Sequence, residues 1–153
     1  FERALTLLIV IAGVLPAAAA DRLSFDRFRA YLIWEGKGKL SKNIARRTDQ
    51  VIANGEEGSS TQVLVDLVVA GGKNTVYEDS PLLLVWVTDP LDSSRPAFVD
   101  KGWSISYVGL TGETVRSIIV DHDCNPVTLH ARIDAGDVIG REVTKELNIT
   151  CGD

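Results

Sequence analysis

Apolar residues alternate with polar ones along most of this chain, and a period of two is typical of strands that bury one face. In the first segment of this kind, Phe28, Ala30, Leu32 and Trp34 fall on one side, and Gly36 lies in the turn that follows. The same alternation returns in later segments, at residues 63–69, 103–107, 115–120, 127–133 and 143–151. The pattern therefore predicts a chain made mainly of short strands.

Residues 82–88 depart from this alternation because they are almost wholly apolar. A continuous apolar run predicts a central strand that is covered on both faces. Together these segments give seven or eight short strands separated by turn signals, a spacing that favours an all-β fold, a single antiparallel β-sandwich of the immunoglobulin-like class. The Cys…Trp…Cys order of antibody domains does not occur, because Trp103 precedes both Cys124 and Cys151.

One segment between the first two strands has helical spacing instead. Ser41 can cap a helix, Ile44 and Val51 lie on one helical face, and Asn54 with the glycine after it can end the helix. The sequence thus predicts one short helix near residues 42–53. A helix of about three turns needs a sheet to pack on, because it is marginal in isolation.

The first twenty residues differ in composition from the rest of the chain. Arg3 precedes an apolar run at residues 4–15, and a proline and four alanines follow before the polar stretch that begins at Asp21. A charged start, an apolar centre and small residues at the end are what a secretory signal peptide requires. We therefore expect a signal-like segment at residues 1–20 and a single domain at residues 21–153, periplasmic or secreted. A retained membrane anchor is less favoured, because a span needs about 20 apolar residues.

The same segment supports a second interpretation. Phe1 and the apolar residues 7–12 resemble the first helix of processed type IV pilins, in which the mature chain begins at a phenylalanine. The acidic residue of that family's fifth position is Leu5 here, and the only acid nearby is Glu2. The resemblance implies a filament subunit that keeps residues 1–20 as an assembly helix. Membrane contact is expected only through this segment, if it is uncleaved.

The expected export of the chain determines how the two cysteines are interpreted. In an oxidising compartment, Cys124 and Cys151 are expected to form a disulfide that pins the last strand to the body of the domain. A redox pair would more often have the Cys-x-x-Cys spacing, whereas these residues lie 27 positions apart.

Both histidines fall near the first cysteine, which raises the question of a metal site. His122, Cys124 and His130 are ligand types for copper or zinc, but the predicted disulfide consumes the cysteine and His130 is expected to face solvent. The aspartates in turns do not match a calcium-binding loop. Motifs for hydrolases, metalloproteases and phosphate-binding loops are also missing from the sequence. We therefore expect no catalytic residue, no metal and no cofactor.

Charge is spread unevenly over the chain. Residues 21–47 carry eight Lys and Arg against three Asp and Glu, whereas residues 48–153 carry seven against seventeen. The positive charge concentrates in a basic segment at residues 36–47, whose cations are Lys37, Lys39, Lys42, Arg46 and Arg47. Such a cluster predicts contact with an anionic partner, either a protein or an anionic surface or glycan, and the alternative is a merely solvated face. Nucleic acid is disfavoured by export and by a pI near 5.0.

These observations favour an exported, non-catalytic binding or accessory module that contacts its partner through the basic segment. The alternative is the filament subunit described above. The sequence leaves the identity of the partner and the oligomeric state open.

Overall fold

The computed structural model describes residues 22–92 and 94–152, in which the chain is all-β. The predicted signal segment at residues 1–20, and with it the alternative assembly helix, lies outside the described residues. In the part of the chain that is described, no helix has both the length and the apolar character needed to cross a membrane.

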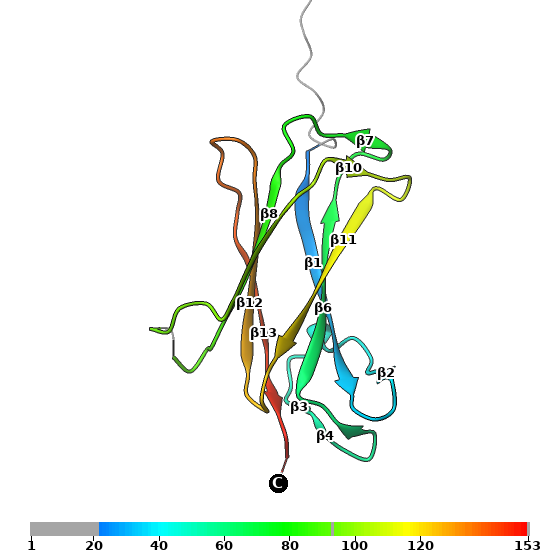
Figure 1. Cartoon of the computed structure of the whole chain (residues 1–153), viewed down its shortest axis with the longest axis vertical. Helices are drawn as coiled ribbons and strands as arrows, with labels where there is room; N and C mark the ends of the chain where they lie inside the picture. Colours follow the sequence, from blue (N-terminus) through cyan, green and yellow to red (C-terminus); the bar gives the residue numbers. More distant parts are fainter. Residues whose placement is uncertain (1–21, 93, 153) are drawn as a thin grey trace, which may run out of the picture.

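Two four-stranded antiparallel sheets form the body of the molecule (Figure 1). The first has the order β11-β6-β1-β2 and consists of β1 (Ser24–Trp34), β2 (Lys39–Leu40), β6 (Gln62–Ala70) and β11 (Glu113–Asp121). The second has the order β13-β12-β8-β9 and consists of β8 (Leu82–Thr88), β9 (Val99–Ser104), β12 (Val127–Asp134) and β13 (Val143–Leu147).

Short strands of two residues each pair outside these sheets. They are β3 (Val51–Ile52) with β14 (Ile149–Thr150), β4 (Asn54–Gly55) with β5 (Gly58–Ser59), and β7 (Thr75–Val76) with β10 (Tyr107–Val108). The described residues therefore hold more strands than the seven or eight predicted, because pairings this short leave no periodic signal in the sequence. The pairing of β3 with β14 is parallel and joins segments far apart in the chain.

Residues that point inward from both sheets share one hydrophobic core. Leu32 on β1, Leu67 on β6, and Leu83 and Leu129 on β8 and β12 are at most 1 % exposed. Burial of one such side chain stabilises the fold by about 1.5–3 kcal/mol. The alternation in the sequence is thus an alternation between this core and the outer faces of the sheets, and the all-β prediction is confirmed.

Strand β8 is central in its sheet, as predicted, but its outer face is only partly covered. Leu83, Val85 and Val87 point into the core and are buried, whereas Trp86 is half-buried and Leu82 remains 40 % exposed. No second layer lies over this face among the described residues. Instead, Trp86 on this face is partly covered by His130 and Arg132 from the adjacent strand β12.

The helix predicted for residues 42–53 is wrong. The only helical turn there is the 3₁₀ turn η2 (Ile44–Arg46), and the chain is extended again at Arg47. Val51 then donates its N–H to the carbonyl of Asn148 at 2.8 Å, and Ala53 donates to Thr150 at 2.7 Å. Pairing with the end of the chain outweighs the weak local helical preference of this segment, which is rich in β-branched residues.

Two predicted strands also have different bounds. The segment predicted at 103–107 begins earlier, as β9, and is interrupted at Ile105, whose N–H donates to the carbonyl of Pro81 at 2.8 Å. The segment predicted at 143–151 divides at Asn148 into β13 and β14, which pair with different partners.

Candidate functional site

The basic segment begins at the end of the first sheet where β1 stops and runs back along the edge of β1 (Figure 1, cyan). The chain turns back through Lys37 into the two-residue strand β2, passes Lys42, and makes the turn η2 that ends at Arg46. All five cations of this segment are exposed, as both a contact surface and a solvated face require. The structure thus places Lys37 and Lys39 at that end, whereas Arg46 lies farther back along β1, in a hollow that it shares with Asp26, Phe28 and Lys145.

Two polar side chains hold this segment against the outer edge of β1. Ser41 accepts a hydrogen bond from the N–H of Leu32 through its Oγ at 2.9 Å. Asn43 Oδ1 accepts from the N–H of Ala30 and from the N–H of Ala45, both at 3.0 Å. These side chains take the place of a neighbouring strand, so the edge of β1 is closed without further backbone pairing.

Only one of the five cations has a carboxylate partner among the described residues. Arg47 donates to both carboxylate oxygens of Asp49, with the Nε–Oδ1 distance at 3.0 Å. The guanidinium lowers the pKa of the Asp49 carboxyl, and the same hydrogen bond raises the pKa of Arg47. Lys37 reaches only the backbone carbonyl of Glu56, at 3.4 Å. The remaining cations, Lys39, Lys42 and Arg46, have charges that no described carboxylate neutralises.

A groove of 520 Å³ lies beside these cations. Its floor is apolar and is formed by buried side chains, among them Trp34, Ile44 and Val51. Leu40 and Ile52 also line the groove, although they are 50 % and 55 % exposed. We call this site the basic groove, defined by Leu40, Lys42, Ile44, Arg47, Val51, Ile52 and Glu57 together with the floor beneath them.

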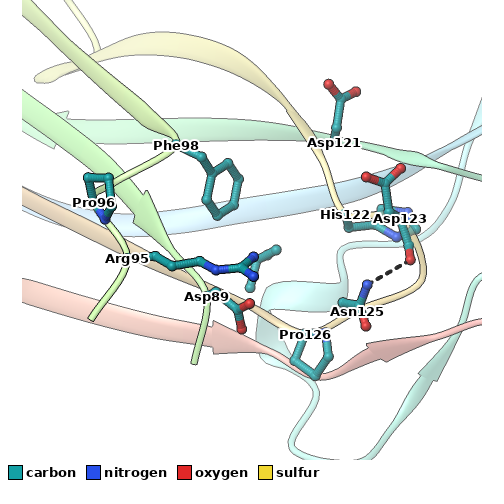
Figure 2. Close-up of a pocket in the computed structure, with 10 residues that line it drawn as sticks. Asp89, Arg95, Pro96, Phe98, Asp121, His122, Asp123, Asn125 and Pro126 are labelled. Carbon is teal, nitrogen blue, oxygen red and sulfur yellow. Dashed lines mark hydrogen bonds between the residues drawn. The ribbon is translucent and has the colours of Figure 1, made fainter. Parts of the chain in front are cut away.

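A second hollow, of 330 Å³, lies between the loop after β8 and the turn between β11 and β12. Figure 2 shows the side chain of Arg95 extending between Phe98 and Asp89. Asp121 and Asp123 lie on the opposite side, and we call this hollow the acidic pocket.

Three charged side chains of the acidic pocket interact within the fold, whereas no hydrogen bond or ion pair among the described residues involves the carboxylate of Asp123. Asp89 Oδ1 accepts from the N–H of Leu91 at 2.8 Å, which fixes the start of the loop. Asp121 Oδ1 accepts from the side-chain amide of Gln62 at 2.7 Å, across the β11–β6 pair. Arg95 pairs with Asp92 at 3.0 Å. This arrangement is that of turn-forming and cross-strand polar groups.

His122 follows β11 and is only 3 % exposed. Its Nδ1 accepts from the N–H of Cys124 at 3.0 Å, so the hydrogen of the neutral ring is on Nε2. Nε2 is buried without a hydrogen-bond partner among the described residues. Burial lowers the pKa of the His122 imidazole below its ordinary value, although the carboxylates of Asp123 and Asp121, and that of Glu35, act in the opposite direction.

Cys124 and Cys151 are joined by a disulfide, with their Cα atoms 5.0 Å apart, as the sequence predicts. Asp123 and Cys124 both have positive φ, 45° and 61°, which gives the β11–β12 turn its left-handed shape. The bridge ties this turn to the residue that follows β14. A disulfide of this kind indicates a non-reducing environment for the protein.

The second histidine lies on a different surface. His130 is on the outer face of the second sheet, where its ring stacks on Trp86 at a centroid distance of 5.1 Å. Its nitrogens contact Thr88 Oγ1 at 2.7 Å and Glu142 Oε1 at 2.8 Å. His122 instead belongs to the buried end of β11, so the structure does not bring the two histidines into one site. No three His, Cys, Asp or Glu side chains within residues 22–92 and 94–152 are grouped to hold a metal ion.

Comparison of the chain with protein-family models and with curated proteins gives no match. The candidate site is therefore defined by its own geometry. The sequence analysis identifies the five cations but misses the groove beside them, together with Ser41 and Asn43, which hold its edge. The sequence feature that could have indicated the groove is Leu40, an apolar residue between lysines in a segment that otherwise contains few large apolar side chains.

Proposed function

We propose that this chain is an exported, non-catalytic binding module, an immunoglobulin-like β-sandwich that contacts an anionic partner through its basic segment. The localisation to the periplasm or the exterior is supported by the disulfide, which persists in those compartments and is rare in the cytosol. The binding role is supported by the exposed cations of the basic segment.

The strand order supports the assignment to the immunoglobulin-like class. Of the seven longest strands, the first, second and fifth (β1, β6 and β11) share one sheet. The third, sixth and seventh (β8, β12 and β13) share the other, and this division is that of immunoglobulin-like sandwiches. The fourth strand, β9, pairs with β8, as an additional edge strand of that second sheet.

The observation that carries the proposal is that Lys39, Lys42 and Arg46, all on the basic segment, are exposed and have no carboxylate partner among the described residues. Because these cations make no ion pair within the described residues, they add no salt bridge to the stability of the isolated domain. An anionic partner would be attracted to them, and the attraction would weaken with salt, because exposed charges are screened over about 8–10 Å at physiological ionic strength.

Charge reversal tests the proposal. Changing Lys39, Lys42 and Arg46 together to Glu should abolish co-sedimentation or pull-down of the anionic partner from the exported fraction, while folding is retained. The matched control reverses the exposed cations Lys73, Lys101 and Arg141, which gives the same net charge at other places on the surface. Binding that is indifferent both to salt and to the first triple variant would show that the basic segment is only a solvated face. Equal loss in both triple variants would show that net charge alone is responsible.

A further inference from the structure

The basic groove has features that charge alone does not require. Leu40 and Ile52 each leave about half of their surface in water, and they line the same hollow above an apolar floor. Covering such side chains is favourable at roughly 25 cal/mol per Å² of apolar area. A ligand that fills the groove therefore needs an apolar group as well as negative charge.

The backbone of Leu40 provides a second feature. Leu40 is opposite Ile33 in the β1–β2 register, and the N–H of the next residue, Ser41, donates to the carbonyl of Leu32 at 3.0 Å. Hydrogen-bonded and non-hydrogen-bonded pairs alternate in an antiparallel ladder, so the N–H and C=O of Leu40 point away from β1. Because β2 is the last strand of its sheet, these groups can pair with an added extended chain.

The charges around the groove indicate which residues of a ligand would flank the apolar group. Lys42 lines the groove and Lys39 is adjacent to Leu40 on β2, and neither has a carboxylate partner among the described residues. Arg47 also lines the groove, but Asp49 already pairs with it. Glu57 lies on the same lining and would repel an anion. Carboxylates of a ligand are therefore favoured near the two lysines.

We propose that the basic groove binds an extended acidic segment of a partner protein, with one large apolar side chain of that segment between Leu40 and Ile52. The acidic side chains on either side of it contact Lys39 and Lys42, and the peptide backbone pairs with Leu40. This inference rests on the proposed function and names the chemistry of the partner. A sulfated or phosphorylated glycan supplies the charge without the apolar side chain, and a bilayer supplies no strand to pair with Leu40.

Selection from a library of random dodecapeptides displayed on phage, with the oxidised full chain as bait, tests this inference. The recovered peptides should carry net negative charge and one large apolar residue flanked by Asp or Glu. In fluorescence anisotropy with a recovered peptide, Ile52→Ser should weaken binding about tenfold, and Lys42→Gln should weaken it and reduce its salt dependence. Glu57→Gln should tighten binding, because it removes a repulsive charge.

The control is Val138→Ser, which removes an exposed apolar side chain at a site outside the groove and should leave binding unchanged. Since Ile52 and Val138 are both mostly exposed, neither variant should impair folding, and amide NMR spectra would verify this while reporting a shift of the Leu40 amide on binding.

Two results would overturn the inference. One is a failure to recover acidic peptides with an apolar residue, and the other is binding that Ile52→Ser leaves unchanged. If polyglutamate, heparin or phosphatidylglycerol vesicles bind with dependence on Lys39, Lys42 and Arg46 but not on Ile52, the proposed function stands and the peptide inference fails. If none of these probes binds, both fail.

Discussion

The acidic pocket and the basic groove lie at the same end of the molecule, where β1 and β11 stop and β12 begins, but they use charge differently (Figure 1). In the acidic pocket, Asp89 and Asp121 accept hydrogen bonds that fix a loop and a strand pair. At the basic groove, Lys42 in its lining and Lys39 beside it make no ion pair within the described residues. A charged side chain that already interacts within the fold is weak evidence for a binding site. A charged side chain without such an interaction is stronger evidence.

The largest expected effect comes from the disulfide beside the acidic pocket. Replacing Cys124 and Cys151 with Ser should lower the free energy of unfolding by about 3–4 kcal/mol, because the unfolded chain regains the entropy of an open loop of 27 residues. Urea denaturation of the wild type and the double variant would measure this. The oxidised wild type with added reductant should approach the variant, and equal midpoints in all three samples would contradict the expectation.

A smaller effect is expected from the polar side chain that holds the basic groove. Asn43→Ala leaves the N–H groups of Ala30 and Ala45 without their acceptor, and an unsatisfied buried donor costs about 1–3 kcal/mol. Thermal or urea unfolding would measure the loss. Asn43→Asp is the matched control, since it retains an acceptor oxygen at the same position. If the two variants lost equal stability, the hydrogen bonds would not be the cause.

The third expectation concerns pH and separates the two regions. Burial lowers the pKa of His122 in the folded state, so the unfolded chain binds the proton more readily near the ordinary histidine value of about 6.5. The free energy of unfolding should therefore fall as the pH drops below about 6.5 toward the lowered pKa, and it should be independent of this group at higher pH.

His122→Asn isolates that contribution, because its side-chain oxygen can still accept from the N–H of Cys124 while the titrating group is gone. Between about pH 5.5 and 7, the unfolding free energy of the variant should change less with pH than that of the wild type. Parallel pH profiles would contradict the assignment to His122.

The smallest effect is expected within the basic groove itself. Arg47→Gln should weaken anionic partner binding less than Lys42→Gln, because Asp49 already neutralises the Arg47 charge. Titration of the partner or selected peptide against both variants at low salt would compare them. A larger loss for Arg47→Gln would mean that Asp49 releases Arg47 on binding.

Period-two alternation predicts the long strands well, because one buried face imposes a pattern that can be counted. It also places both cysteines at strand ends, and their disulfide is predicted from the sequence on the expectation that the chain is exported. The error at residues 42–53 has a different origin: the backbone of Val51 and Ala53 pairs with residues near 150, and no local pattern records so distant a partner. The five cations can be read directly from the sequence. The groove beside them cannot, because it forms only when folding brings Trp34, Ile44 and Val51 together.

The parallel pairing of Val51 with Ile149 also sets an order of events in time. One wall of the basic groove, at Ile52, is held by a segment that is synthesised almost a hundred residues later. Contacts between such distant segments form late in folding, because closing a long loop costs entropy before the contacts stabilise the fold. In a chain synthesised from its amino terminus, the groove is therefore complete only after residues 149–151 have been made. Shorter chains would carry the five cations without the finished groove.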